Sequence, residues 1–375
     1  MELFDVYPLY DVTPVAAKGI VVTDNKGKEY LDFYGGHAVI SIGHSHPHYV
    51  KSLKEQLDKI GFYSNSVQNP LQSELATKLG QLSGCADYNL FMCNSGAEAN
   101  ENALKLASFH TGKSRVIAFK NSFHGRTSAA VATTDNEKIN APLNKQQRVT
   151  FLSLNDIDSF REEIAKGDVC AVIIESIQGV GGLDEPSTEF YRQIAKECEE
   201  QRVILIADEV QSGFGRSGKF FAFQHHGIQP DIISIAKGMG NGFPVGGILI
   251  HESIKATYGM LGTTFGGNHL ACAATIAVLE VLENEGLIAN AHKLGQYFKE
   301  KALGIQLVKR IKGRGLMLGL EFDFKVADLR KRLIHNQHLF TGGAKDPHVL
   351  RVLPALNITR SHLDIFFEAL QNELS

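Results

Sequence analysis

Two short runs in which every side chain is apolar place the strongest constraint on the fold. They are 171–174 (Ala-Val-Ile-Ile) and 203–207 (Val-Ile-Leu-Ile-Ala). A strand that is apolar on both faces must be covered on both, as in a parallel sheet flanked by helices. Helical segments such as 189–201 alternate with the candidate strands 89–93, 115–119, 149–152, 169–175, 203–208, 232–235 and 245–250. These patterns predict an α/β fold with a mostly parallel sheet.

The two ends of the chain have a different pattern, which predicts a second, smaller domain. An N-terminal β-hairpin is expected at 20–33, around a turn at 24–27. After 268 we expect two helices as far as 302, broken near Gly286, and then an α+β segment that ends in a helix at 361–374. Its other elements are a strand-like stretch at 307–322, a helix at 326–336 and a strand at 349–353. The expected domains are therefore a large one at 44–267 and a small one formed by 1–43 and 268–375.

Charge and cysteine content limit what the chain can bind. The formal net charge of −3 gives no electrostatic bias toward nucleic acid or an anionic membrane. Met1 to Tyr10 lack the basic and apolar regions of a secretory signal, and no apolar run approaches the roughly 20 residues of a membrane helix. The five cysteines are scattered and never CxxC-spaced, which is typical of reduced thiols. We expect a cytoplasmic protein that binds no nucleic acid, membrane or metal.

Three alternating histidines, His44, His46 and His48, could bind a metal. No cysteine or acidic partner lies near them in sequence. A polar turn around Pro47 is therefore the favoured interpretation.

A helix is expected to begin directly after the strand 89–93. Ser95 can cap this helix, and the small residues Gly96 and Ala97 leave backbone N–H groups uncovered at its positive end. Such an end can hold a phosphate group. An ordinary N-cap explains the same residues, so both interpretations stay open.

Two further motifs place ionisable side chains where apolar strands end. Asp208 lies at the sheet edge where open α/β folds bind ligands, and it could act as a base, hold a metal or pair with a protonated ring nitrogen. A helix cap or a surface ion pair would explain it equally well. Lys237 follows the strand 232–235 and enters a glycine-rich loop. Most lysines are solvated, but an apolar setting lowers the pKa of a lysine, as imine formation requires.

The glycine-rich loops match neither of the common nucleotide-binding patterns. None reads G-x-G-x-x-G after a strand, and none reads G-x-x-x-x-G-K-[ST]. NAD and ATP sites therefore lose their main support.

Together these segments resemble the class III, or ω-amino-acid, aminotransferases, which are pyridoxal-phosphate (PLP) enzymes of fold type I. The resemblance runs from Asp32-Phe33-Tyr34-Gly35-Gly36 to the C-terminal helix, with the motifs in the expected order. Within the family it is strongest to the acylornithine aminotransferases of arginine biosynthesis. It implies a PLP-dependent transferase fold, PLP as cofactor, amino-acid and 2-oxo-acid substrates, and a homodimer with shared active sites.

The resemblance also implies a role for each residue near the cofactor. Lys237 would form an imine with PLP and then move protons, while Asp208 would keep the ring nitrogen protonated. Gln211 would bind the ring hydroxyl, and Val210 and Phe123 would contact the two faces of the ring. The phosphate would be bound by Ser95, Gly96 and Ala97, and Thr264 would reach the phosphate of the cofactor in the neighbouring subunit.

For the substrates, the resemblance implies that two arginines bind carboxylates. Arg126 would clamp the carboxylate distant from the reacting amine, and Arg351 would bind the α-carboxylate of glutamate. This arrangement suits transfer of the δ-amino group of an N-acylornithine to 2-oxoglutarate, which gives the N-acylglutamate semialdehyde and glutamate.

Two positions depart from the family pattern. Relatives usually have a glutamate, which pairs with the second arginine, where this chain has Val180. His37 stands where ornithine aminotransferases have a tyrosine that grips the free amino-acid end. These departures motivate the hypothesis that the acyl group is itself acidic, such as succinyl, rather than acetyl.

Several other activities fit the same motifs. The chain could be another ω-aminotransferase, acting on ornithine, 4-aminobutyrate or a diamine, or it could be an aminomutase or decarboxylase of the same fold. A non-catalytic binding protein that retains the fold is a further alternative. The combination of Lys237, Asp208, Gln211 and Phe123 argues against the last, because binding alone requires no electron sink with an imine-forming lysine.

Overall fold

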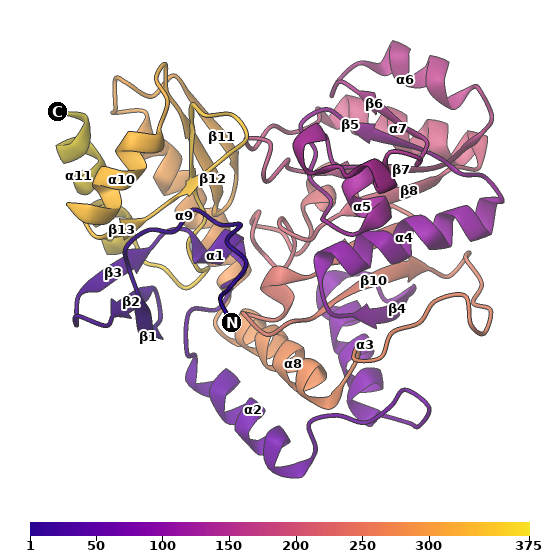
Figure 1. Cartoon of the computed structure of the whole chain (residues 1–375), viewed down its shortest axis with the longest axis horizontal. Coiled ribbons are helices and arrows are strands. Elements are labelled where there is room, and N and C mark those ends of the chain that lie inside the picture. Colours follow the sequence, from indigo (N-terminus) through magenta and orange to yellow (C-terminus); the bar gives the residue numbers. More distant parts are fainter.

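The computed structural model describes residues 1–375 and contains three β-sheets (Figure 1). One half of the molecule is built on a seven-stranded sheet flanked by helices. The other half contains two four-stranded sheets and the C-terminal helices. The predicted α/β class is therefore confirmed.

The central sheet has the strand order β4-β10-β9-β8-β7-β5-β6. Its strands are β4 (Tyr88–Cys93), β5 (Arg115–Phe119), β6 (Val149–Leu152), β7 (Val169–Glu175), β8 (Ile204–Asp208), β9 (Ile232–Ile235) and β10 (Gly246–His251). Strand β10 runs antiparallel to both of its neighbours, β4 and β9, and the other strand pairs of this sheet are parallel. Every residue of β7 and β8 is buried, as their apolar sequences predict. Glu175, the last residue of β7, is paired in register with Asp208, the last residue of β8.

The helices around this sheet begin and end where local signals predict. Helix α3 (Pro70–Ser83) begins with a proline and ends at Gly84, whose φ of 75° is left-handed. Helix α4 (Gly96–Thr111) begins after Ser95 and packs against several strands of the sheet. The remaining helices are α5 (Ser128–Ala132), α6 (Ile157–Ile164) and α7 (Thr188–Gln201), with 3₁₀ turns at Glu137–Ile139, Pro142–Asn144, Ala222–His225 and Lys237–Met239.

The two ends of the chain meet in one sheet. The expected N-terminal hairpin is present as β2 (Val21–Asp24) and β3 (Glu29–Asp32), with an additional strand β1 (Pro14–Lys18) beside it. Strand β13 (Leu339–Phe340) pairs in parallel with β3, so a C-terminal segment completes the N-terminal sheet. This pairing supports a small domain built from both ends, although its boundaries at 43/44 and 267/268 stay a prediction.

The last sheet and the C-terminal helices follow the expected order. The strand-like stretch at 307–322 is a hairpin of β11 (Arg310–Arg314) and β12 (Met317–Glu321), which continues through β15 (Val349–Val352) to β14 (Gly342–Gly343). The break near Gly286 separates α8 (His269–Asn284) from α9 (Leu287–Ala302). Helices α10 (Ala327–His335) and α11 (Arg360–Leu374) complete the chain.

The polar turn predicted around Pro47 is wrong. Pro47 is the first residue of α2 (Pro47–Lys59), a position where its missing N–H costs no helical hydrogen bond. Helix α2 packs against α8, and this contact brings acidic residues from far along the chain to the histidines. His46 bonds to Glu285 and His48 to Glu280 on that side, whereas His44 bonds to Asp32. Each of the three histidines therefore pairs with a different carboxylate.

All five cysteines are buried and unpaired. None of the helices combines the length and the apolar character that crossing a membrane requires.

Candidate active site

A cavity of about 350 Å³ opens at the carboxyl ends of β7, β8 and β9. This is the edge at which open α/β sheets bind ligands. Besides Lys237, eight of the site residues expected from the sequence line it: Ser95, Gly96, Ala97, Phe123, Arg126, Asp208, Val210 and Gln211. Val180 lines it as well. Residues from distant parts of the chain are thus gathered around a space large enough for a small ligand.

Lys237 enters the cavity from a strained backbone position. Its φ of 49° lies in the left-handed region, which costs a residue with a side chain on the order of 1–3 kcal/mol and is common at functional sites. Burial lowers the pKa of its amine, while the charges of Asp208 and Glu175 oppose that shift. A lowered pKa increases the fraction of uncharged amine near neutral pH, which is the nucleophilic form.

Asp208 is 4% exposed and is held by three N–H donors. Nδ2 of Asn100 and Nδ1 of His124 both lie 2.7 Å from its Oδ2. The backbone N–H of Val210 donates to Oδ1 over 3.0 Å. The carboxylate is therefore fixed in one orientation at the base of the cavity.

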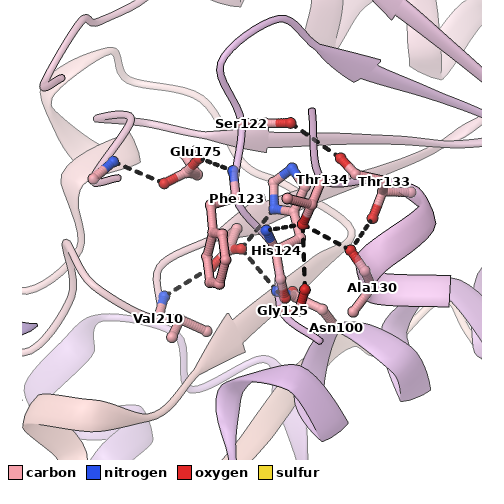
Figure 2. A network of polar contacts seen from close by, with 12 residues as sticks. Asn100, Ser122, Phe123, His124, Gly125, Ala130, Thr133, Thr134, Glu175 and Val210 are labelled. Atoms are coloured by element: carbon pink, nitrogen blue, oxygen red, sulfur yellow. Dashed lines mark hydrogen bonds and ion pairs between the residues drawn. The ribbon is translucent and has the colours of Figure 1, made fainter. Parts of the chain in front are cut away.

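The segment that follows β5 forms a wall of the cavity through Phe123 (Figure 2). The backbone N–H of Phe123 donates to Oε1 of Glu175 over 2.9 Å. The other oxygen of that carboxylate, Oε2, accepts from the N–H of Gly179. Burial raises the pKa of Glu175 to about 7. Val210 also lines the cavity, so two apolar side chains border the same space as Asp208.

The start of α4 forms another part of the lining. Ser95 is the N-cap, and its Oγ accepts from the N–H of Glu98 over 3.2 Å. A Cβ atom on Gly96 would lie 2.5 Å from Cγ1 of Val210, so only glycine allows this close approach. The first turn therefore presents backbone to the cavity, as an anion site at a helix N-terminus requires. The capping interpretation and the phosphate interpretation are compatible.

The two predicted substrate arginines lie in different environments. Arg126 is exposed and lines the cavity. Arg351 is 3% exposed and lies outside the lining, where it donates to the backbone carbonyls of Gly343 (2.6 Å) and Gly179 (2.7 Å). Burial lowers the pKa of Arg351. The close partners of Arg351 are therefore backbone carbonyls.

His37 and Thr264 also lie outside the cavity lining of this chain. His37 belongs to α1 (Gly35–Ala38), a single left-handed turn in which its own φ is 68°. Burial lowers the pKa of His37 to about 4, and the hydroxyl of Tyr34 lies 2.5 Å from its Nδ1. Its backbone carbonyl accepts from Nε2 of Gln211, which connects this turn to the cavity. Thr264 is exposed.

Three residues at the cavity carry contacts that the sequence did not reveal. Asn100, His124 and Glu175 all line it and form its hydrogen-bond network (Figure 2). Two signals were present in the sequence: His124 directly follows Phe123, and Asn100 lies one turn after Gly96 on α4.

The donor set suits a flat heteroaromatic ring that carries an anionic group. A buried carboxylate, apolar side chains and the N-terminus of a helix all line the cavity. Two buried polar atoms beside it, Nε2 of His124 and Oδ1 of Asn100, have no hydrogen-bond partner in the protein. An amine with a lowered pKa completes the arrangement. The cavity thus fits a ring with an ionisable nitrogen, an aldehyde and a phosphate, such as PLP.

The comparisons with known proteins agree with this geometry. The family described as Aminotransferase class-III matches residues 6–374. The acetylornithine aminotransferase of Bacillus subtilis is 42% identical over 368 residues, which cover 96% of this chain and 94% of that protein. The acetylornithine aminotransferase of Aquifex aeolicus is 40% identical over 375 residues, which cover 96% of each chain.

Solved structures show the same architecture. The ornithine aminotransferase of Toxoplasma gondii superposes with a TM-score of 0.90 at 27% identity and covers 98% of this chain and 91% of its own. Another structure of that enzyme reveals partial occupancy of PLP at its active site; its TM-score is 0.89 at 27% identity, covering 97% of this chain and 90% of its own. These findings also exclude the non-catalytic alternative. The chain belongs to the class III aminotransferases and is a transaminase that uses PLP as its cofactor.

Proposed function

We propose that the enzyme transfers the δ-amino group of an N-acylornithine to 2-oxoglutarate, giving the N-acylglutamate semialdehyde and glutamate, as a cytoplasmic step of arginine biosynthesis. The names of the relatives at 42% and 40% identity support an acylated ornithine as donor. One structural observation carries the proposal: Lys237, Asp208 and Arg126 line a single cavity, so an amine-reactive group and a carboxylate clamp share one space.

The residues around the cavity would divide the work on PLP. Bound PLP supplies an aldehyde that forms imines with amines and a ring that takes up electrons from the reacting carbon. Lys237 would hold the aldehyde carbon, and Asp208 would pair with the ring nitrogen. The ring would lie between Phe123 and Val210, with Gln211 at its hydroxyl. Backbone N–H groups of Ser95, Gly96 and Ala97 would bind the phosphate.

Lys237 would also act after the substrate amine has replaced it. Burial lowers the pKa of its Nζ, which increases the fraction of uncharged amine. Such an amine can take a proton from the reacting carbon of the substrate and return it to the cofactor side. Phe123 and Val210, which line the cavity, would limit the access of water to this proton.

The buried guanidinium of Arg351 supports a dicarboxylate acceptor. Its two close ligands are neutral carbonyls, so the positive charge is not cancelled by an ion pair. A substrate carboxylate that reaches it would gain a charged partner at Nη2, because Nε and Nη1 already donate to carbonyls. Both 2-oxoglutarate and glutamate carry carboxylates at two ends, which suits Arg351 at one end and Arg126 at the other.

A substrate panel tests the proposed donor. Glutamate formation from 2-oxoglutarate would be measured with N-acetylornithine, N-succinylornithine, ornithine, 4-aminobutyrate and a diamine. We expect kcat/KM for the better acylornithine to exceed that for ornithine by at least about tenfold, because the free α-amino group of ornithine must be desolvated in the pocket. A higher kcat/KM for ornithine, the amine in the name of the similar Toxoplasma gondii enzyme, would contradict the proposal.

The same panel decides the acyl group. The imidazole of His37, with a pKa of about 4, is neutral at pH 7 and offers no charge to a succinyl carboxylate. Arg351 is then the cation that could favour the acidic acyl group. A clear preference for the acetyl compound removes the succinyl hypothesis.

Replacing Arg126 by alanine is expected to raise KM for the amino donor and lower kcat/KM by about 100-fold, because one carboxylate loses its charged partner. Arg126→Lys should lose less, since it keeps the charge without the bidentate fork. The matched control is Arg148→Ala, a 60% exposed arginine whose partner is Asp168. Equal kcat/KM for the Arg126→Ala and Arg148→Ala enzymes would rule out the clamp.

We also propose a homodimer in which Thr264 reaches the phosphate of the partner's cofactor. Thr264 is exposed. Beside it, Phe265 (59% exposed) packs at a tilt against Phe62 (43% exposed), with the ring centroids 5.4 Å apart, in an uncovered apolar cluster. Exposed apolar clusters of this kind mark interfaces. Sedimentation at micromolar concentration should give twice the 41.1 kDa chain mass. A single-chain mass under those conditions contradicts the shared site.

A further inference from the structure

Two arginines from the C-terminal part of the chain contact the same glycine. Arg351 lies on β15, and its Nε donates to the carbonyl of Gly343 over 2.6 Å. Arg330 lies on α10, and a Cβ atom added to Gly343 would lie only 2.7 Å from its Nη1. Because Gly343 has no side chain, both guanidinium groups can lie against β14.

Neither guanidinium is paired with a carboxylate. Nε and Nη2 of Arg330 donate to the carbonyl of Thr341 over 3.3 and 3.1 Å, which leaves Nη1 without an acceptor. Nε and Nη1 of Arg351 donate to the carbonyls of Gly343 and Gly179, which leaves Nη2. Burial lowers the pKa of Arg351, and the like charge of Arg330 contributes to that shift. An anion bound between the two groups would cancel their repulsion.

This pair of cations lies beside the substrate cavity. Nη1 of Arg351 is 3.5 Å from Oε1 of Gln211, which lines the cavity. Nε2 of Gln211 donates to the carbonyl of His37. Burial lowers the pKa of His37 to about 4, and the positive charges of Arg351 and Arg330 contribute. Positive charge from both α10 and β15 therefore acts on this side of the cavity.

We propose that Arg330 is a substrate-binding residue that shares with Arg351 the carboxylate next to the reacting carbon of 2-oxoglutarate and glutamate. A carboxylate has two oxygens, whereas Arg351 offers one free nitrogen. Nη1 of Arg330 would bind the second oxygen, so that one carboxylate bridges two guanidinium groups. The inference rests on the proposed function, because it requires a dicarboxylate acceptor that reaches Arg351.

A shared carboxylate would make the two half-reactions depend differently on Arg330. Glutamate and 2-oxoglutarate carry a carboxylate next to the reacting carbon. An N-acylornithine carries a methylene group at that place and needs no cation there. Arg330 should therefore determine specificity for the acceptor and be nearly neutral for the amino donor.

Three substitutions of Arg330 in the full-length enzyme loaded with PLP test the inference. Arg330→Leu removes the charge and the hydrogen bonds to the Thr341 carbonyl. Arg330→Gln removes the charge but keeps an N–H donor for that carbonyl. Arg330→Lys keeps the charge without the planar fork. The two half-reactions are followed separately in single turnover, one with glutamate and one with the best acylornithine of the panel.

We expect kcat/KM for glutamate to fall about 30-fold in Arg330→Leu and in Arg330→Gln, mostly through KM, as for the loss of a hydrogen bond between charged groups. Arg330→Lys should recover most of that loss. The value for the acylornithine should change less than about threefold. Calorimetry gives a measurement without turnover: glutarate, a dicarboxylate with no reacting group, should bind about 30-fold more weakly to Arg330→Gln than to the wild type.

Lys331→Leu is the matched control, since it removes one positive charge from the same helix. Lys331 is 64% exposed and its partner is Asp328. A loss for glutamate as large in this control would show that only the net charge matters and would overturn the inference. A loss in Arg330→Leu without one in Arg330→Gln would mean that Arg330 only binds the Thr341 carbonyl. Equal losses in both half-reactions would also contradict the shared carboxylate.

The wild-type enzyme separates failure of the inference from failure of the proposed function. If it forms no glutamate from 2-oxoglutarate, the proposed acceptor is wrong and the inference falls with it. If it does form glutamate, and Arg330→Gln keeps the wild-type kcat/KM for glutamate, only the role of Arg330 is wrong.

Discussion

Replacing Lys237 by alanine is expected to lower kcat by about 10⁴-fold or more, because the enzyme loses both the amine that holds the cofactor and the group that moves the proton. Lys237 is the lysine that lines the cavity, and no second amine there could take over these two functions. Turnover with the best donor of the panel would be measured by glutamate formation at saturating PLP.

Borohydride reduction gives a second measurement on the same variant. In the wild-type enzyme, reduction should fix the mass of PLP on the peptide that contains Lys237, whereas the alanine variant should retain no covalent cofactor. Lys196→Ala is the matched control, since that lysine is 73% exposed on α7 and pairs with Glu200. Covalent label on another lysine, or a loss of activity as large in the control, would refute the assignment.

Asp208→Asn is expected to reduce kcat by about 10³-fold. Removing one member of a buried charged pair costs about 3–5 kcal/mol, and each 1.36 kcal/mol is a factor of ten in rate. The amide also turns an NH₂ group toward a site where Asn100, His124 and Val210 all donate, so at least one donor loses its acceptor. Turnover and the Kd for PLP would be measured together.

A matched control exists at the opposite edge of the sheet. Asp231 accepts from the N–H of Leu205 and precedes β9, far from the carboxyl ends of the strands. Asp231→Asn should lower stability without a selective loss of kcat. Activity of the Asp208→Asn enzyme within tenfold of wild type would show that the ring nitrogen has no charged partner at this position.

The predictions made from local patterns agree closely with the structure. Strands such as 115–119, 169–175 and 232–235 have the observed bounds, and the helix from Pro70 to Gly84 has the expected ends. The alternation of apolar residues, the helix caps and the helix-breaking residues each involve only a few neighbouring positions. Secondary structure can therefore be predicted from them without knowledge of the tertiary contacts. The prediction of a turn around Pro47 was wrong because proline is favoured both in turns and at the first position of a helix.

The candidate site was predictable to a lesser extent. Lys237 and Asp208 follow apolar strands, and the shared edge of a sheet brings such positions together. Asn100 and His124 form hydrogen bonds with Asp208, although they lie 108 and 84 residues away from it in the sequence. No local pattern predicts contacts between residues so far apart. The carbonyl ligands of Arg351 were missed for the same reason, since Gly179 and Gly343 approach it only in the folded chain.

The amino-acid sequence by itself determined the α/β class, the positions of most strands and helices, and the ionisable groups that end the central strands. Its motifs were also sufficient to indicate the family. The tertiary structure alone decided which distant side chains meet: the acids that pair with His44, His46 and His48, and the donors that hold Asp208. The physical reason is that secondary structure follows from neighbours within one or two turns, whereas the partner of a buried polar group is set by how separate elements pack.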